Sequence, residues 1–187
     1  MRELLSRWQR RCIGSRLARI TLLVLDVDGV LTDGGLWFDP EGRLQKRFDV
    51  RDGLGLRLLQ QAGVQLVFLS GGKGGATEVR ARQLGIQHCL VEIKDKTAAL
   101  TTLQRELGID KSQTAFIGDD LNDLAVRQQI ALLITPADAC EAVRRQANWV
   151  LSRRGGHGAV REAAEGILKS RGAWDSLRRQ GWRERND

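Results

Sequence analysis

The chain has 187 residues, of which 42% are hydrophobic and 28% are charged, and its formal net charge is +7. This composition excludes an intrinsically disordered chain, and the length suits one compact domain with its own core. No apolar run approaches the ~20 residues of a membrane span, and arginines interrupt residues 1–19, where a signal peptide needs an apolar stretch. Cys12, Cys89 and Cys140 are too few and too scattered for a disulfide framework or a zinc site, which favours a reducing cytoplasm.

The positive charge is concentrated at the two ends. Residues 1–19 contain six arginines and one glutamate, and residues 171–187 contain five arginines and three acids. A nucleic-acid binder is one interpretation, but the chain has few aromatic residues and no tyrosine, so platforms for base stacking are scarce. The ends are better interpreted as solvated segments or as a surface that attracts anionic substrates. We therefore expect a small-molecule partner, and neither nucleic acid nor a membrane.

The middle of the chain reads as strands that alternate with helices. Ile20–Leu25 is a continuous apolar run, typical of a strand buried on both faces. Asp39-Pro40-Glu41-Gly42 is a turn signal between Trp37–Phe38 and Leu44–Val50, which predicts a β-hairpin. Further strands are predicted at Val64–Leu69, His88–Val91, Thr114–Ile117, Ala131–Ile134 and Trp149–Leu151. Helices are predicted at Leu54–Gln61, Ala76–Leu84, Lys94–Leu107, Asn122–Gln128, Ala137–Gln146 and Gly158–Ser170, and the tail beyond Gly172 is expected to lack regular structure.

This alternation predicts an α/β fold with a doubly wound, Rossmann-like parallel sheet and helices on both faces. In such folds ligands bind at the carboxyl ends of the strands. Asp26 and Asp28 follow the first predicted strand, and Ser70 with several glycines follows the second. Gly118-Asp119-Asp120 and Asp123 follow the fourth. Carboxylates and small polar residues therefore gather at one edge of the sheet.

The residue types at this edge indicate a particular chemistry. Crowded carboxylates such as Asp26, Asp28 and Asp119 repel one another and need a cation, and hard oxygen ligands favour Mg²⁺. A carboxylate can act as a nucleophile, and a second one can protonate the leaving oxygen. Ser70 and Lys96 could hold a phosphate, although a flexible loop and a surface lysine explain them equally well. Helix capping explains one aspartate at a strand end but not the whole group.

Four motifs in this order resemble the haloacid dehalogenase superfamily of phosphatases. They are Leu22–Gly34, Val64–Ser70, Lys96 and Gly118–Asp123. Within the superfamily, Asp49–Gly55 and Gly155–Glu162 are similar to segments of the family that acts on 3-deoxy-D-manno-octulosonate 8-phosphate. The resemblance implies a cytoplasmic phosphatase of lipopolysaccharide biosynthesis, formed by residues 1–187 as a single domain. The stretches 1–19, 35–48 and 172–187 are then a basic segment, a hairpin insertion and a basic tail.

The resemblance also implies roles for individual residues. Asp26 is expected to be the nucleophile and Asp28 the general acid/base, whose backbone carbonyl also binds Mg²⁺. Asp119 is expected to be the third protein ligand of the metal. Ser70, Gly71 and Lys96 are expected to hold the phosphoryl group. Asp120 and Asp123 are expected to orient Lys96 and the metal's waters. Arg51 and Asp52 are expected to contact the substrate.

One position departs from the family pattern. The family usually carries arginine directly after the Ser/Thr-Gly of the second motif, where it serves recognition of the anionic substrate, and this chain has Gly72 followed by Lys73. Arg80 matches an arginine expected in the following helix, and Lys73 is a candidate replacement that lacks a bidentate fork. Two alternatives therefore stay open, a phosphatase for a sialic-acid-type 2-keto sugar acid 9-phosphate and a non-catalytic member of the family.

The hairpin replaces the large cap domain of many relatives. The resemblance implies a homotetramer in which hairpins from residues 35–48 pack together and neighbouring subunits cover each active site. The apolar hairpin residues Leu36, Trp37, Phe38, Leu44 and Phe48 fit such packing, because an isolated exposed hairpin carrying them would be a liability. The alternative is that these residues fold back on their own core.

Overall fold

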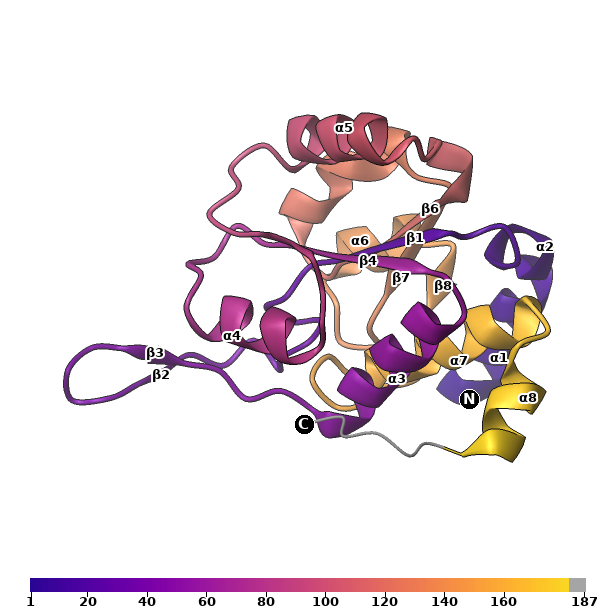
Figure 1. Cartoon of the computed structure of the whole chain (residues 1–187), viewed down its shortest axis with the longest axis horizontal. Helices are drawn as coiled ribbons and strands as arrows, with labels where there is room; N and C mark the ends of the chain where they lie inside the picture. The colour runs from indigo at the N-terminus through magenta and orange to yellow at the C-terminus, as the bar shows by residue number, and fades with distance from the viewer. Residues whose placement is uncertain (182–187) are drawn as a thin grey trace.

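A six-stranded parallel sheet forms the centre of the molecule, with the strand order β5-β4-β1-β6-β7-β8. The computed structural model describes residues 1–181, and of Arg2 only the backbone. The strands are β1 (Leu22–Leu25), β4 (Gln65–Leu69), β5 (His88–Leu90), β6 (Thr114–Ile117), β7 (Leu132–Thr135) and β8 (Trp149–Val150). The chain runs from β1 to β4 and β5 on one side and returns to β6, β7 and β8 on the other, which confirms the predicted doubly wound fold (Figure 1).

The first strand lies in the middle of the sheet and is covered on both faces. Leu22 is paired with Gln65 of β4 and with Thr114 of β6. Successive side chains of a strand point to opposite faces, so Leu22 enters one hydrophobic core and Leu23 enters the other. The apolar run is continuous because both faces of this strand are covered by a hydrophobic core.

Helices cover both faces of the sheet. On one face lie α5 (Lys96–Leu107), the 3₁₀-helix η2 (Leu121–Gln129) and α6 (Glu141–Gln146), and on the other α2 (Gly14–Leu17), α3 (Val50–Gln61), α4 (Ala76–Gln83) and α7 (Ala159–Ser170). Figure 1 shows α5 above the sheet, with α3 and α7 below it. The outer helices are α1 (Arg2–Cys12) and α8 (Trp174–Gln180), and the short η1 (Lys111–Gln113) precedes β6. Within residues 1–181, no helix combines the length and apolarity that crossing a bilayer requires.

Two terminal segments differ from the expectation. The tail beyond Gly172 was expected to lack regular structure, which is wrong for Trp174–Gln180, because these residues form α8. Trp174 and Leu177 pack against the core, and Lys169 lies 4.8 Å from the Trp174 ring centroid. This contact with α7 stabilises a helix too short to be recognised from its own pattern. Residues 182–187 lie outside the described residues.

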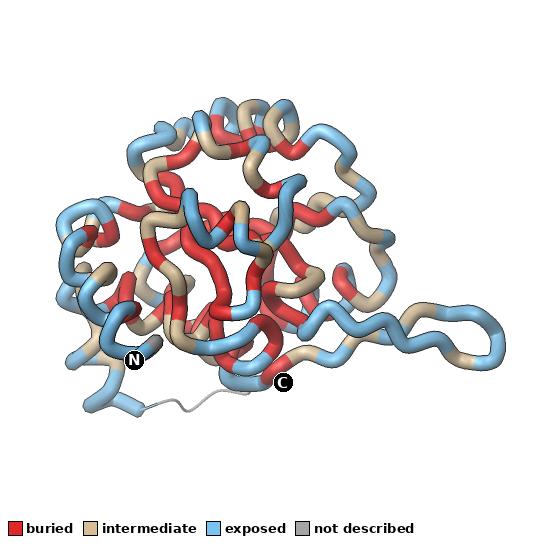
Figure 2. The backbone as a smooth tube through the Cα atoms, turned by 180° about the vertical axis from the view of Figure 1, so that it is seen from behind, coloured by how far each residue is buried: buried red, intermediate tan, exposed pale blue. Residues whose placement is uncertain are grey.

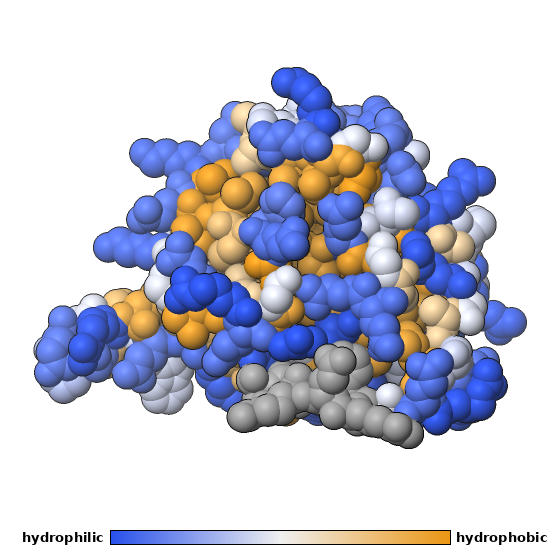
Figure 3. Space-filling view, viewed as in Figure 1, coloured by the Kyte–Doolittle hydropathy of each residue, from blue (hydrophilic) through white to orange (hydrophobic). Residues whose placement is uncertain are grey.

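The predicted hairpin is present as β2 (Trp37–Phe38) and β3 (Leu44–Gln45), and it projects from the body of the molecule (Figures 1 and 2). Leu36, Trp37 and Phe38 are 61%, 64% and 64% exposed, whereas Phe48 packs against the core. Figure 3 shows hydrophobic side chains partway along this arm and hydrophilic ones at its tip. The alternative was that the apolar hairpin residues fold back on their own core. Phe48 does so, whereas Leu36, Trp37 and Phe38 do not.

Candidate active site

Three carboxylates converge at the carboxyl ends of β1 and β6. Asp26 directly follows β1, while Asp119 and Asp123 follow β6, and one oxygen from each lies within 4.8 Å of the others. Asp26 and Asp123 are 6% and 0% exposed. Three acids in so small and buried a space repel one another strongly unless cations neutralise them.

Lys96 supplies one of these cations. Its ammonium lies 3.0 Å from Asp26 Oδ1 and 2.6 Å from Asp123 Oδ1, and its side chain is 3% exposed. The carboxylate of Asp95 accepts a hydrogen bond from the Ala98 backbone, so it caps the helix that begins at Lys96 and fixes where this ammonium lies. Asp123 Oδ2 accepts hydrogen bonds from the backbone N–H groups of Asp119 and Asp120. Asp123 therefore links Lys96 to the loop after β6.

Two glycines make room for these carboxylates. A Cβ at position 29 would collide with the carboxylate of Asp119, and a Cβ at position 118 would collide with that of Asp123. Gly29 also has a φ of +82°, a backbone conformation that costs other residues about 1–2 kcal/mol. Gly29 thus lets the loop after β1 approach Asp119, and Gly118 leaves room for Asp123 in the segment after β6.

The electrostatics of the cluster favour an additional cation. Burial, together with the charge of Asp123, raises the pKa of Asp26 to about 6 against the opposing effect of Lys96. Burial and the charges of Asp26, Asp123 and Asp120 raise the pKa of Asp119 to about 7. Burial lowers the pKa of Lys96, but the two acids outweigh it, so the net shift is upward. Asp119 Oδ1 is buried and has no hydrogen-bond partner among residues 1–181, which fits an oxygen aimed at a metal ion.

The carboxylate of Asp28 lies beside a second lysine. Lys46 Nζ lies 2.8 Å from Asp28 Oδ1 and 2.9 Å from Oδ2, and it donates to Thr77 Oγ1 over 3.2 Å. The Lys46 side chain is 1% exposed. Sequence reasoning missed Lys46 and Thr77. The signal for Lys46 is the period of two in the returning strand, which places Leu44, Lys46 and Phe48 on one face.

Ser70 lies at the end of β4, next to the loop that contains Gly72. It is 1% exposed, and its Oγ accepts a hydrogen bond from the Gly72 backbone over 3.0 Å. A Cβ at position 72 would lie 2.9 Å from Asp28 Oδ2 and 3.3 Å from Ser70 Oγ. Gly71 is exposed in the same loop. The strand ends β1, β4 and β6 therefore all contribute polar groups to this edge of the sheet.

The comparisons with known proteins agree with this geometry. A model of the haloacid dehalogenase-like hydrolases matches residues 43–130. The 3-deoxy-D-manno-octulosonate 8-phosphate phosphatase of Haemophilus influenzae is 39% identical over 143 residues, which cover 76% of this chain and 79% of that protein. The chain belongs to the 3-deoxy-D-manno-octulosonate 8-phosphate phosphatase family.

Solved structures of this phosphatase family share the fold. The crystal structure of the Yersinia pestis enzyme matches with a TM-score of 0.85 at 37% identity and covers 87% of this chain and 88% of that one. The Moraxella catarrhalis phosphatase, crystallised in complex with magnesium ion, phosphate ion and a KDO molecule, matches with a TM-score of 0.88 at 38% identity. This match covers 91% of this chain and 98% of that chain.

The two residues expected to replace or accompany the family's substrate-recognising arginine differ in burial: Arg80 is buried and Lys73 is exposed. Arg80 is 8% exposed, and its guanidinium lies 5.8 Å from the Phe48 ring centroid. Lys73 is exposed and makes no hydrogen bond or ion pair within the described part of the chain. Lys46, rather than Lys73, is therefore the lysine that lies next to the space at Gly72.

Three other predicted residues have structural contacts of their own. Arg51 pairs with Asp49 at 2.6 Å. Asp52 is 1% exposed and accepts hydrogen bonds from the backbone N–H groups of Arg161 and Gly158, so it fixes the start of α7. Burial raises its pKa to about 6. Asp120 caps η2 through the Leu121 N–H. A contact of Asp52 with substrate and an orienting role for the Asp120 carboxylate stay predictions, which these placements do not favour.

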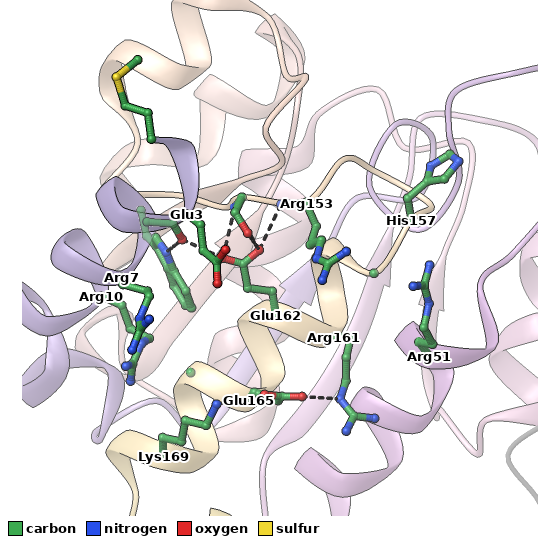
Figure 4. A pocket seen from close by; sticks show the side chains of 16 residues that line it. Glu3, Arg7, Arg10, Arg51, Arg153, His157, Arg161, Glu162, Glu165 and Lys169 are labelled. Atoms are coloured by element: carbon green, nitrogen blue, oxygen red, sulfur yellow. Dashed lines mark hydrogen bonds and ion pairs between the residues drawn. The ribbon is translucent and has the colours of Figure 1, made fainter.

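A large cavity lies on another side of the molecule. It has a volume of about 920 Å³ and is lined mainly by charged side chains of α1, α7 and the loop before α7 (Figure 4). Glu162 accepts hydrogen bonds from Ser6, Ser152 and the Arg153 backbone in this region. None of the three clustered aspartates lines it, whereas Arg51, one of the predicted substrate contacts, does.

Proposed function

We propose that this chain is a phosphatase that hydrolyses 3-deoxy-D-manno-octulosonate 8-phosphate to the free sugar acid and phosphate through an aspartyl-phosphate intermediate. The observation that carries the proposal is the cluster of Asp26, Asp119, Asp123 and Lys96 at one sheet edge. Its support is the similarity to phosphatases of this name over about three quarters of the chain. We further infer a cytoplasmic enzyme of lipopolysaccharide biosynthesis.

In the proposed reaction, a carboxylate oxygen of Asp26 attacks phosphorus and the bond from phosphorus to the sugar oxygen breaks. Asp28 protonates the leaving oxygen and then takes a proton from the water that attacks the phosphorus of the intermediate. Lys96 balances the charge of the phosphoryl oxygens, and Ser70 with the Gly71 backbone positions them. The second attack releases phosphate and restores the Asp26 carboxylate.

The donor set fits Mg²⁺, the ion present in the Moraxella catarrhalis structure. Asp26, Asp119 and the backbone carbonyl of Asp28 would hold it, and Asp123 is the third carboxylate within reach. When bound, the ion supplies positive charge that offsets the repulsion between the acids and the incoming phosphate. The raised pKa values of Asp26 and Asp119 and the unpartnered Asp119 Oδ1 support this assignment.

A direct test measures phosphate release from 3-deoxy-D-manno-octulosonate 8-phosphate with and without Mg²⁺. We expect turnover that depends on Mg²⁺ and disappears in Asp26→Asn. Asp110→Asn is the matched control, because Asp110 caps the short η1 helix away from the cluster. Unchanged turnover in Asp26→Asn would refute the proposal, and inactivity of the wild-type chain against all sugar acid phosphates would favour the non-catalytic alternative.

Because of Gly72, a second candidate substrate is considered, a sialic-acid-type 2-keto sugar acid 9-phosphate. The space at Gly72 borders Asp28 and Lys46 and lacks the family's arginine. A screen of 2-keto sugar acid phosphates, run in parallel on the wild type and on Gly72→Arg, separates the two. Preference of the wild type for the 9-phosphate would replace the leading substrate while leaving the chemistry unchanged.

We also propose a homotetramer in which the hairpins pack together. The exposed Leu36, Trp37 and Phe38 support this proposal, since an arm that leaves them in water is unfavourable. Light scattering should report four subunits for the wild type and smaller species for the double variant Trp37→Ser, Phe38→Ser. Val79→Ser, at an exposed apolar residue of α4, is the control. A monomeric wild type would contradict this arrangement.

A further inference from the structure

Helix α1 turns its apolar residues outward. Met1, Leu4, Leu5 and Trp8 are exposed by 104%, 71%, 52% and 63%. The spacing places Leu4, Leu5 and Trp8 on one face of the helix, with Met1 at its N-cap, and we call these four residues the apolar stripe of α1. An apolar stripe normally faces a protein core, so a stripe that faces water indicates an external partner.

The inward side of α1 is polar and fixed. Ser6 is 1% exposed, donates to Glu162 over 2.6 Å and accepts a hydrogen bond from the Trp149 indole over 2.7 Å. Gln9 accepts a hydrogen bond from the Val150 backbone over 2.9 Å. A rotation of the helix that buried the stripe would break all three hydrogen bonds and leave Glu162 and Trp149 with fewer partners. The apolar stripe is therefore held outward.

One side of α1 borders the arginine-rich cavity. Arg7 and Arg10 reach it from α1, and Figure 4 shows them near Lys169 of α7. The cavity is lined by six basic and three acidic side chains. Within the part of the chain that the structure describes, Arg7, Arg10 and Arg153 form no ion pair with an acid. This side of α1 thus presents uncompensated positive charge.

The other side of α1 borders an apolar hollow of about 290 Å³. Leu5 of the stripe lines it together with Val150 and Leu151 at the end of the sheet. Arg144 and Arg145 of α6 stand at the same hollow together with Glu141, which forms an ion pair with Arg145. The stripe therefore continues into a second apolar surface and again has arginines beside it.

We propose that α1 binds the surface of a membrane that contains anionic phospholipids. The apolar stripe would enter the boundary between headgroups and acyl chains, and the arginines on both sides would contact the lipid phosphates. A second copy of the chain is a poorer occupant, because two such faces would bring like-charged arginines together. The sequence expectation of no membrane partner rested on the absence of a spanning segment, and a helix lying on a surface needs none.

The test is flotation of the full chain with lipid vesicles. We expect binding to vesicles of phosphatidylcholine mixed with phosphatidylglycerol, weaker binding at high salt, and none to phosphatidylcholine alone. The double variant Leu4→Glu, Trp8→Glu should not bind. Arg7→Gln combined with Arg10→Gln should weaken binding by about fivefold per arginine.

The controls separate this site from the catalytic one. Val79→Glu, at an exposed residue of α4, should bind vesicles like the wild type. Phosphatase turnover should be the same in the α1 variants as in the wild type. The proposal is overturned if the wild type ignores anionic vesicles, or if Leu4→Glu, Trp8→Glu binds them as well as the wild type does. It is also overturned if the double variant only changes the subunit number seen by light scattering, because the stripe then contacts a second copy.

Discussion

Lys46 holds the carboxylate of Asp28 with both oxygens within 2.9 Å of its ammonium. Lys46 directly follows the hairpin strand β3, whereas Asp28 belongs to the loop after the central strand. The exposed arm is thus connected by a partly buried ion pair to the residue proposed as general acid/base. Thr77 of α4 completes the contact.

Replacing Lys46 with Met should lower kcat by up to about hundredfold, because Asp28 loses the group that positions it. KM should change less, since Lys96 still neutralises the phosphoryl group. Thr77→Val, which removes only the hydrogen bond, should have a smaller effect in the same direction. Steady-state kinetics with 3-deoxy-D-manno-octulosonate 8-phosphate provide the measurement.

The control for this series is Arg43→Met, at an exposed arginine of the same hairpin. It should behave like the wild type. If Lys46→Met leaves kcat unchanged, or raises KM alone, then Lys46 does not position Asp28.

Gly29→Ala should abolish stabilisation by Mg²⁺ and reduce turnover by at least about hundredfold, because the added Cβ displaces Asp119. Gly63→Ala is a matched control, since Gly63 has a similar φ of +76° but no neighbour within 4 Å of the added Cβ. Both variants should lose about 1–2 kcal/mol of unfolding free energy from backbone strain. Thermal melts with and without Mg²⁺ distinguish them, and equal behaviour of the two variants would contradict the clash.

Without metal, the chain should lose stability as pH rises from about 4 to about 7. Asp26 and Asp119 have folded pKa values of about 6 and 7, above the ordinary 3.8. Between those values the folded state binds more protons than the unfolded state, so each deprotonation favours unfolding. Mg²⁺ should reverse the loss near neutral pH, because it favours the ionised carboxylates.

Melting temperatures across this pH range, with Mg²⁺ and with a chelator, test the sign. Asp119→Asn should flatten the metal-free profile. Asp52, whose folded pKa is also about 6, contributes a parallel loss that Mg²⁺ does not reverse. A metal-free profile that rises with pH would show that the acidic cluster does not control it.

Gly72→Ala should lower kcat only by about twofold, because its Cβ would lie 2.9 Å from Asp28 Oδ2, the end of a flexible side chain that can shift slightly. Gly71→Ala offers the comparison, since its Cβ would make only an ordinary 3.5 Å contact with the Ile93 carbonyl. Equal turnover in the two variants would contradict the prediction, because the Asp28 carboxylate would then accommodate the added Cβ without loss of activity.

The sheet was predictable because its strands are local and apolar. The run before Asp26 needs no distant information to be recognised as a strand buried on both faces. The convergence of Asp26, Asp119 and Asp123 was also accessible, since parallel strands place their carboxyl ends at one edge. The position of Lys96 followed from its motif.

What could not be predicted depends on packing between distant segments. The pair of Lys46 and Asp28 requires the angle at which the hairpin leaves the body, which no local pattern encodes. The capping of α7 by Asp52 joins residues more than 100 positions apart, so Asp52 resembled a substrate contact in the sequence. Helix α8 forms because Trp174 meets α7, and its seven residues carry too weak a pattern by themselves.

The hydrogen bond from Ser6 to Glu162 spans 156 positions of the chain. During synthesis on the ribosome, α1 is made before β8 and α7 and cannot dock until Glu162 and the Trp149 indole have been made. Its polar inward side, with Ser6 and Gln9, therefore stays without its native partners until late in translation. Among the helices of residues 1–181, α1 is made early and is one of the last to reach its native place.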